Sequence, residues 1–294
     1  MNNKEKCSQF KKMIHDEKIL VAPGIYDSFS AKMAERIGFK TAYLGGSCVS
    51  MTKLGIADTG LITYKEIIEH ARYIVEATNI SIFADGDNGY GNALNVQRTV
   101  REYEAAGLVG MQLDDLILPK RYCKPDKQII TREEMEGKIK AAVDARINED
   151  FTIIYRTLGR VNQDLDEAIE RSNIAVKAGA DVVFVEGLDS EEEIDRVAKE
   201  VKAPLLISMN EKRFTSNFTA KEMEQKGYSI GLFPVTAIKA AVENVEKVLK
   251  QLKEEESVIN CKNQIMDTTR FYDYLDLDKC KETEKKYIPY KNNL

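Results

Sequence analysis

Eight short apolar segments, rich in β-forming residues, alternate with helix-length amphipathic segments along most of this 294-residue chain. They cover residues 19–24, 41–46, 80–87, 109–115, 151–157, 181–187, 204–210 and 229–234. Strands that are apolar on both faces and alternate with helices are typical of parallel sheets. Eight such units in about 235 residues predict an α/β fold, a (β/α)8 barrel of the TIM type, whose typical size is about 250 residues. A doubly wound open sheet is the alternative, but the glycine-rich fingerprint after its first strand is missing here.

The segments between the expected strands have the pattern of amphipathic helices. Apolar residues recur at helical spacing in residues 64–78, 96–107 and 164–180. A glycine follows each of three expected helices, where a C-terminal cap would fall: Gly107, Gly179 and Gly227. We therefore expect a helix after each strand.

The last part of the chain departs from this alternation, and we divide the chain accordingly. Residues 1–252 are expected to form the catalytic barrel, and residues 253–294 a C-terminal helical tail. The tail is polar, with apolar side chains clustered at Phe271, Tyr272, Tyr274 and Leu275. One or two helices packed outside the barrel or against another subunit are expected, and a solvated tail is the alternative.

Composition excludes several classes of function. The formal net charge is −5 and no block rich in Lys or Arg stands out, so a nucleic-acid partner is not expected. No apolar segment is long enough to cross a bilayer. The five cysteines are scattered and odd in number, which indicates a reduced, cytoplasmic protein without a cysteine metal site.

Charged residues gather where the expected strands end, which is where (β/α)8 barrels place their function. These positions are Asp85, Asp87, Asp114, Asp115, Arg156, Glu186, Ser208, Asn210 and Glu211, with Gly45, Gly46 and Ser47 after the second strand. So many acids at one end repel one another unless a cation is present, and their hard oxygen atoms suit Mg²⁺ or Mn²⁺. The pair Asp85 and Asp87 therefore predicts a divalent metal that faces an oxyanion substrate. A calcium loop, one alternative, fails at Tyr90 and Val96; a helix-capping turn, the other, leaves the remaining charged strand ends unexplained.

Several motifs together resemble the isocitrate lyase/phosphoenolpyruvate mutase superfamily. They are VAPGIYDSFSAKMAERIGF (21–39), YLGGS (43–47), GIADTGLIT (55–63), FADGDNGYGN (83–92), LDDLILPKRYC (113–123), YRT (155–157), FVEG (184–187) and NEKRFTSNFTAKEM (210–223). They run in order over residues 20–250. No single motif is specific to the superfamily, but the motifs together are.

The resemblance implies a metal-dependent enzyme with an enolate of pyruvate as its intermediate. Asp85 would ligate the metal, supported by Asp58, Asp87 and Asp114 largely through waters. The substrate would be a small carboxylate, held by the backbone amides of Gly45, Gly46 and Ser47, by Arg156 and Glu186, and by Tyr43, Ser208 and Asn210. The loop near residues 118–130 would be a gate that contributes Lys120 and Cys123 to catalysis. Members of the superfamily are usually homotetramers, made of dimers that exchange their last barrel helix.

The resemblance leaves four functions open. The first is a Mg²⁺-dependent carbon–carbon lyase that releases pyruvate from a small 2-hydroxy dicarboxylate, like methylisocitrate and dimethylmalate lyases. The second is an oxaloacetate decarboxylase; a phosphoenolpyruvate mutase and an inactive binding barrel follow. Glu186, Ser208, Asn210, Arg213 and the basic gate suit the lyase, which must hold a second acid. Two other features of the gate favour the decarboxylase: Cys123 lies one place later than the cysteine of those lyases, and their Gly-His pair is absent.

Overall fold

The computed structural model of the protein describes residues 2–16, 18–120 and 129–288. It divides into two compact units, Met1–Ile238 and Lys239–Leu294. The predicted Cys123 lies outside the described residues.

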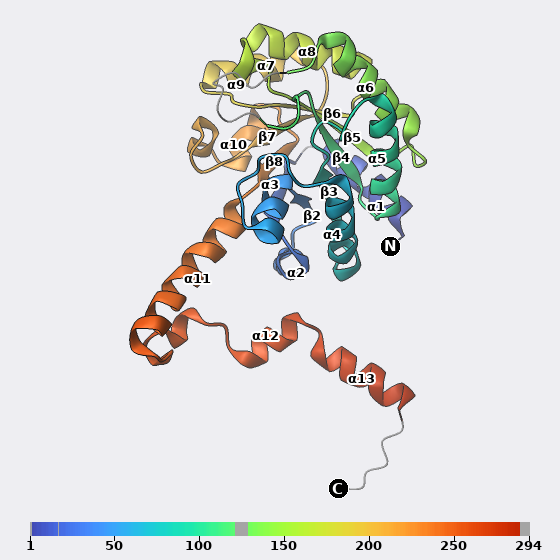
Figure 1. Ribbon diagram of the computed structural model, residues 1–294. Coiled ribbons are helices and arrows are strands. Elements are labelled where there is room, and N and C mark those ends of the chain that lie inside the picture. The colour runs from blue at the N-terminus through green and yellow to red at the C-terminus, as the bar shows by residue number, and fades with distance from the viewer. Residues whose placement is uncertain (1, 17, 121–128, 289–294) are drawn as a thin grey trace, which may run out of the picture. The chain divides into compact units, whose positions relative to one another are not determined.

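The first unit is a closed barrel of eight parallel strands, so the predicted fold is confirmed (Figure 1). The strands are β1 (Leu20–Ile25), β2 (Thr41–Leu44), β3 (Ser81–Asp85), β4 (Gly110–Asp114), β5 (Thr152–Thr157), β6 (Val182–Val185), β7 (Leu205–Ser208) and β8 (Ile230–Phe233). Each strand pairs with the next along the chain. β1 pairs with β8, with Leu20 opposite Ile230, and this pairing closes the barrel.

Helices alternate with the strands and surround them in Figure 1. They are α2 (Ser28–Ile37), α3 (Gly46–Val49), α4 (Tyr64–Ala77), α5 (Ala93–Ala105), α6 (Arg132–Ala145), α7 (Gly159–Asn162), α8 (Leu165–Lys177), α9 (Glu191–Glu200) and α10 (Ala220–Gln225), with a π-helical turn at Ser50–Leu54 and a 3₁₀ turn at Phe214–Asn217. The expected glycines Gly107, Gly179 and Gly227 have φ angles of 87°, 105° and 94°. They therefore adopt the left-handed conformation that ends helices and that suits glycine.

Local sequence explains where two of the helices, α4 and α10, begin. The Thr63 side chain accepts a hydrogen bond from the backbone N–H of Glu66, whose carboxylate accepts one in return from the backbone N–H of Thr63. Thr219 and Glu222 repeat this capping box at α10. Each box satisfies N–H groups that a helix end would leave without partners.

The first helix, α1 (Asn3–Ile14), precedes β1 and packs on the barrel. Its Cys7, Phe10 and Ile14 are buried, and the Phe10 ring lies 5.4 Å from that of Phe83 in β3. The Lys6 ammonium donates to the carbonyl oxygen of Thr78. The apolar face of α1 therefore joins the main core.

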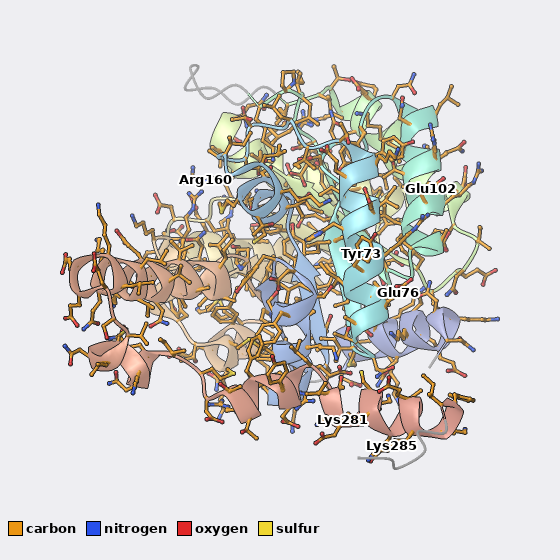
Figure 2. All side chains as sticks on the ribbon, turned by 60° about the horizontal axis from the view of Figure 1, so that its bottom comes forward. Tyr73, Glu76, Glu102, Arg160, Lys281 and Lys285 are labelled. Atoms are coloured by element: carbon orange, nitrogen blue, oxygen red, sulfur yellow. The ribbon has the colours of Figure 1, made fainter. Side chains whose placement is uncertain are left out.

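The second unit carries the predicted C-terminal helices. Most of α11 (Thr236–Glu255) lies in it, followed by a 3₁₀ turn (Ile259–Gln264), α12 (Thr268–Tyr274) and α13 (Leu277–Tyr287). The Asn244 side-chain amide donates to the carbonyl oxygen of Gln264, which ties the turn to α11. Lys281 and Lys285 lie one turn apart on α13 (Figure 2). Among the described residues, no helix combines the length and apolar character needed to span a membrane.

Candidate active site

The carboxyl ends of the parallel strands meet at one end of the barrel, and the predicted charged residues lie there. Asp85 is the last residue of β3 and Asp114 the last of β4. Arg156 is the next-to-last residue of β5, Glu186 directly follows β6, and Ser208 ends β7. This end of the barrel is where side chains from several strands converge on one site.

Asp85 and Asp114 point into the barrel. The Gln112 side-chain amide donates to Asp114 Oδ1 at 3.1 Å and reaches Asp85 Oδ1 at 3.5 Å. Residues two apart in a strand share a face, so Gln112 and Asp114 have the same orientation in β4. The inward face of β4 therefore supports both carboxylates.

Backbone donors fix the Asp85 carboxylate. Gly46 N–H donates to Oδ2 at 3.1 Å, and Asp87 N–H donates to Oδ1 at 3.0 Å. A Cβ atom on Gly46 would lie 3.0 Å from Oδ2, closer than most real contacts of this kind. Only a residue without a side chain fits position 46 without displacing Asp85.

Lys120, from the predicted gate, makes ion pairs with two acids close to Asp85. The Lys120 ammonium is 2.7 Å from Asp58 Oδ2 and 3.1 Å from Asp87 Oδ1. Burial and the neighbouring Asp85 raise the pKa of Asp87 to about 6, although Lys120 opposes that rise. Burial lowers the pKa of Lys120, but the carboxylates of Asp87, Asp85 and Asp58 raise it above its ordinary value overall. Lys120 is therefore a permanent cation in this cluster.

The donor set suits a hexacoordinate hard cation. Among the described residues, no three His, Cys, Asp or Glu side chains are placed to hold a metal ion together. Mg²⁺ usually takes only one or two carboxylates directly and keeps several waters, however, and Asp85 and Asp87 can supply that number. Asp87 Oδ1 is buried and faces the Lys120 ammonium at 3.1 Å, and within the described part of the chain no other group donates to it. Such an oxygen atom is a suitable ligand for Mg²⁺ or Mn²⁺.

Arg156 joins two of the predicted acids. Its guanidinium donates to Asp114 Oδ2 at 3.0 Å and to Glu186 Oε2 at 2.9 Å, and it lies 5.2 Å from the Phe184 ring centroid. Burial raises the pKa of the Asp114 carboxyl, and the charge of Arg156 opposes that rise. Arg156 therefore carries a fixed positive charge beside the acid pair at the end of β3, where it can bind a substrate oxyanion.

The predicted binding residues of β2 lie against the same acids. Tyr43 is buried, with its ring 5.1 Å from that of Phe83, and burial together with Asp85 raises the pKa of its hydroxyl well above the ordinary value. Gly45 precedes α3, and Gly46 and Ser47 form its first turn. The Gly46 amide donates to Asp85 in this structure, so the substrate-binding role of these residues stays a prediction.

Ser208 and Asn210 lie at the end of β7, beside Glu186. The Thr215 hydroxyl donates to the Ser208 carbonyl oxygen at 2.6 Å, which holds the following loop on the strand. Asn210 Oδ1 accepts the backbone N–H of Lys212 at 3.4 Å. The guanidinium of Arg213 reaches Glu186 Oε1 at 3.4 Å. This loop therefore places a third cation at the mouth of the barrel.

Asp115 does not belong to the mouth, which corrects its grouping with the other strand-end acids. Its buried carboxylate accepts hydrogen bonds from Tyr155 Oη at 2.9 Å, Thr157 Oγ1 at 2.8 Å and the Leu158 backbone N–H at 2.9 Å. The Arg171 guanidinium of α8 lies 3.5 Å away. Because side chains alternate along a strand, Asp115 points outward where Asp114 points inward. That alternation was the signal in the sequence that separates the two.

The base of the predicted gate is described only in part. An isolated antiparallel bridge pairs Leu116 with Ile129, which brings the two ends of the loop together. Lys120 is the last residue described before the gap at 121–128. The role of Cys123 as a general acid therefore stays a prediction.

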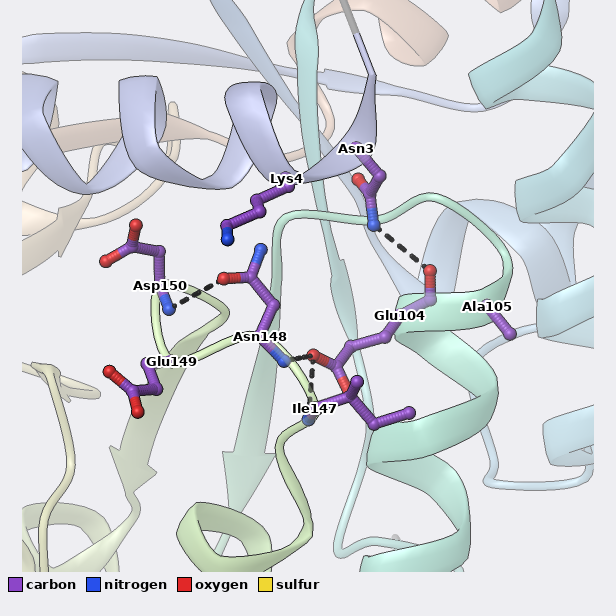
Figure 3. Close-up of a pocket in the computed structure, with 8 residues that line it drawn as sticks. All are labelled: Asn3, Lys4, Glu104, Ala105, Ile147, Asn148, Glu149 and Asp150. Carbon is purple, nitrogen blue, oxygen red and sulfur yellow. Dashed lines mark hydrogen bonds between the residues drawn. The ribbon is translucent and has the colours of Figure 1, made fainter.

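Figure 3 shows a cavity of about 720 Å³ whose lining residues are not those of the candidate site. Asn3, Lys4, Glu104, Ala105, Ile147, Asn148, Glu149 and Asp150 line it. The Glu104 carboxylate accepts the backbone N–H groups of Ile147 and Asn148 at 3.0 and 2.8 Å, so its oxygen atoms already hold the loop before β5. That loop precedes its strand, at the end of the barrel that serves stability.

Comparison with known proteins agrees with this geometry. Residues 10–253 match the protein family described as phosphoenolpyruvate phosphomutase. The chain is 38% identical over 283 residues to a 2,3-dimethylmalate lyase of Eubacterium barkeri, covering 96% of this chain and 98% of the relative. It is 38% identical over 273 residues to a 2-methylisocitrate lyase of Aeropyrum pernix, covering 92% of this chain and 88% of the relative.

The solved structures agree as well. A structure of oxaloacetate acetylhydrolase with the inhibitor 3,3-difluorooxalacetate superposes with a TM-score of 0.89 at 27% identity, covering 96% of this chain and 97% of that one. The family match spans nearly the whole barrel, and the acids that carry the resemblance lie together at its mouth. The chain is therefore an enzyme of the isocitrate lyase/phosphoenolpyruvate mutase superfamily and belongs to the phosphoenolpyruvate phosphomutase family within it.

Proposed function

We propose that the protein is a Mg²⁺- or Mn²⁺-dependent carbon–carbon lyase that releases pyruvate from a small 2-hydroxy dicarboxylate, such as a methylated malate. The observation that carries this proposal is the division of the mouth into two parts. Asp85 and Asp87 form an acidic part for a cation, and Arg156, Glu186 and Arg213 form a chain of ion pairs toward β7. A substrate with two carboxylates could bind through the cation at one part and through the guanidinium groups at the other.

The residues have distinct roles in this reaction. Asp85 and Asp87 would hold a Mg²⁺ or Mn²⁺ ion, which would supply Lewis-acid polarisation of the substrate. Arg156 would bind the carboxylate of the pyruvate half through N–H groups that now donate to Asp114 and Glu186. The hydroxyl proton leaves to a carboxylate of the mouth as C2=O forms and the C2–C3 bond breaks. Cys123 is the candidate that returns a proton to C3.

The two leading reactions differ in where the electron pair goes. In cleavage of a 2-hydroxy dicarboxylate, the pair remains on C3 and spreads into the carboxylate of the leaving acid. In decarboxylation of oxaloacetate, the pair moves toward the ketone and forms an enolate of pyruvate, while the far carboxylate departs as CO₂. The pyruvate enolate implied by the resemblance therefore belongs to the decarboxylation route alone.

The oxaloacetate decarboxylase remains the second candidate, because Cys123 is displaced and Gly-His is absent from the gate. Pyruvate release, measured by a coupled assay over substituted malates, oxaloacetate and phosphonopyruvate, separates the candidates. We expect oxaloacetate to be turned over at least ten times less efficiently in kcat/KM than the best substituted malate, about 1.4 kcal/mol in transition-state binding. If oxaloacetate is the best substrate and no substituted malate is cleaved, the decarboxylase is correct. Metal-dependent binding without turnover of any substrate would instead indicate an inactive barrel.

We also propose a cytoplasmic homotetramer, built from dimers that exchange their last barrel helix. Exposed apolar residues recur on α11 at helical spacing: Val242, Val245, Leu249 and Leu252. A stripe of this kind is suited to another helix surface. Leu249→Asp should lower the mass measured by light scattering below that of the tetramer, whereas Lys250→Asp, next to it, should not. A wild-type monomer would contradict the assembly.

A further inference from the structure

The structure points to Arg213 as the residue that selects the reaction. We propose that its guanidinium binds the carboxylate of the leaving acid and thereby favours carbon–carbon cleavage over decarboxylation. This inference rests on the proposed function, because it assigns one subsite of that reaction.

Arg213 has a fixed backbone and an accessible guanidinium. Its backbone N–H donates to the Asn210 carbonyl oxygen at 2.9 Å, and its own carbonyl oxygen accepts the Ser216 hydroxyl at 2.7 Å. Its side chain is 50% exposed and makes its ion pair to Glu186 at 3.4 Å. A guanidinium has five N–H donors, so this contact leaves donors that can turn to a ligand. The loop thus positions the charge without burying it.

The surroundings of Arg213 suit a small acid with an alkyl group. A narrow cavity between the ends of β6 and β7 is lined by Arg213, Glu186 and Ser208 and by the apolar Phe184, Leu188 and Ile207. It has room for about one water molecule as it stands. A carboxylate would therefore bind at its rim, on the guanidinium, with a methyl-sized group directed into the cavity.

Glu186 links this subsite to the reacting centre. Its Oε2 accepts from Arg156 at 2.9 Å, and its Oε1 lies 3.4 Å from Arg213. The two guanidinium groups therefore lie on either side of one carboxylate. Arg156 would hold the pyruvate half and Arg213 the other half of the same substrate.

The sign of the charge change gives Arg213 opposite effects on the two reactions. In carbon–carbon cleavage, the carboxylate of the leaving acid gains negative charge as C2–C3 breaks, so a cation stabilises the transition state more than the bound substrate. In decarboxylation, the same carboxylate loses its charge as it becomes neutral CO₂. A cation there stabilises the bound substrate and slows the step.

Arg213→Met and Arg213→Lys test this assignment. For Arg213→Met, kcat/KM for the best substituted malate should fall at least tenfold, while kcat for oxaloacetate decarboxylation should stay equal or rise. Arg213→Lys keeps the charge but not the planar fork of donors. Its kcat/KM for the substituted malate should lie between those of the wild type and Arg213→Met. Inhibition by pyruvate should not change, because pyruvate lacks the second carboxylate. Lys212→Met, an exposed charge on the same turn, is the matched control and should leave both rates unchanged.

Each outcome is decisive. An equal loss of both activities would mean that Arg213 only holds Glu186, and an unchanged malate reaction would mean that it binds nothing; either result overturns the inference and leaves the proposed function intact. A wild-type enzyme that cleaves no substituted malate overturns the proposed function and the inference with it.

Discussion

Two acidic regions at the same end of the barrel are equally buried and have different surroundings. After β4, the Asp115 carboxylate receives three hydrogen bonds and a nearby guanidinium, Arg171. After β3, Asp87 Oδ1 faces the Lys120 ammonium at 3.1 Å, and among the described residues no other group donates to it. Burial alone therefore does not distinguish a structural acid from a functional one.

The difference is one of compensation. Removing a charge from water costs several kcal/mol, and hydrogen bonds and an opposite charge must offset that cost. Asp115 has this compensation from its own fold. Asp85 and Asp87 lie close together, and burial and the Asp85 charge raise the pKa of Asp87; in the proposed function a divalent cation would offset this repulsion. Removing the functional acid should affect activity, and removing the structural acid should affect stability.

Asp85→Ala should give the largest effect. We expect activity to fall by on the order of 10³-fold, the upper scale for loss of an electrostatic contact to a transition state. The fold should survive, because the change also removes repulsion with Asp87. Turnover with Mg²⁺, with Mn²⁺ and after chelation, together with a melting curve, tests both statements. A wild-type enzyme that is fully active in excess chelator would rule out the metal.

Asp115→Ala should destabilise the fold. Arg171 would lose one partner while its side chain is 4% exposed, and breaking a buried pair costs about 3–5 kcal/mol. Denaturant unfolding measures this change. Asp166→Ala removes a carboxylate that is 81% exposed and pairs with Arg196, so it should cost at most about 1 kcal/mol. Equal losses for the two variants would contradict the structural role of Asp115.

Cys123→Ser should lower kcat by about 10²-fold, the usual scale for loss of a general acid. Lys120, Arg121 and Lys124 surround Cys123 in the sequence, and nearby positive charge stabilises the thiolate that remains once the Cys123 thiol has given its proton to C3. Cys280→Ser, at an exposed thiol, is the control. Near-normal turnover in Cys123→Ser would mean either that the reaction is a decarboxylation or that another residue, such as Tyr122, is the general acid.

Gly46→Ala should give the smallest effect. The added Cβ would lie 3.0 Å from Asp85 Oδ2 and displace it slightly, so we expect about tenfold weaker metal binding, the lower end for changes beside a ligand. Titration of the metal-free protein with Mn²⁺ measures this affinity. Gly137→Ala in α6, where a Cβ would meet nothing within 4 Å, is the control and should leave Mn²⁺ affinity unchanged. If Gly46→Ala binds Mn²⁺ normally, Asp85 is not its ligand.

The sequence by itself determined the barrel and most of the charged end. The eight expected strands correspond to β1–β8, since continuous apolar segments that alternate with amphipathic helices are typical of a parallel sheet covered on both faces. The same order placed Asp85, Asp114, Arg156 and Glu186 at strand ends. Local pattern suffices for such features, because strand and helix periods depend on neighbouring residues alone.

Only the tertiary structure decided how these residues are partnered. It separated Asp114 from Asp115 by the direction of their side chains, and it brought Lys120 onto Asp58, 62 positions earlier in the chain. It also placed Arg156 and Arg213 on one carboxylate, that of Glu186. Such contacts depend on how loops from different strands close over the barrel end, and no local period in the sequence encodes that distance.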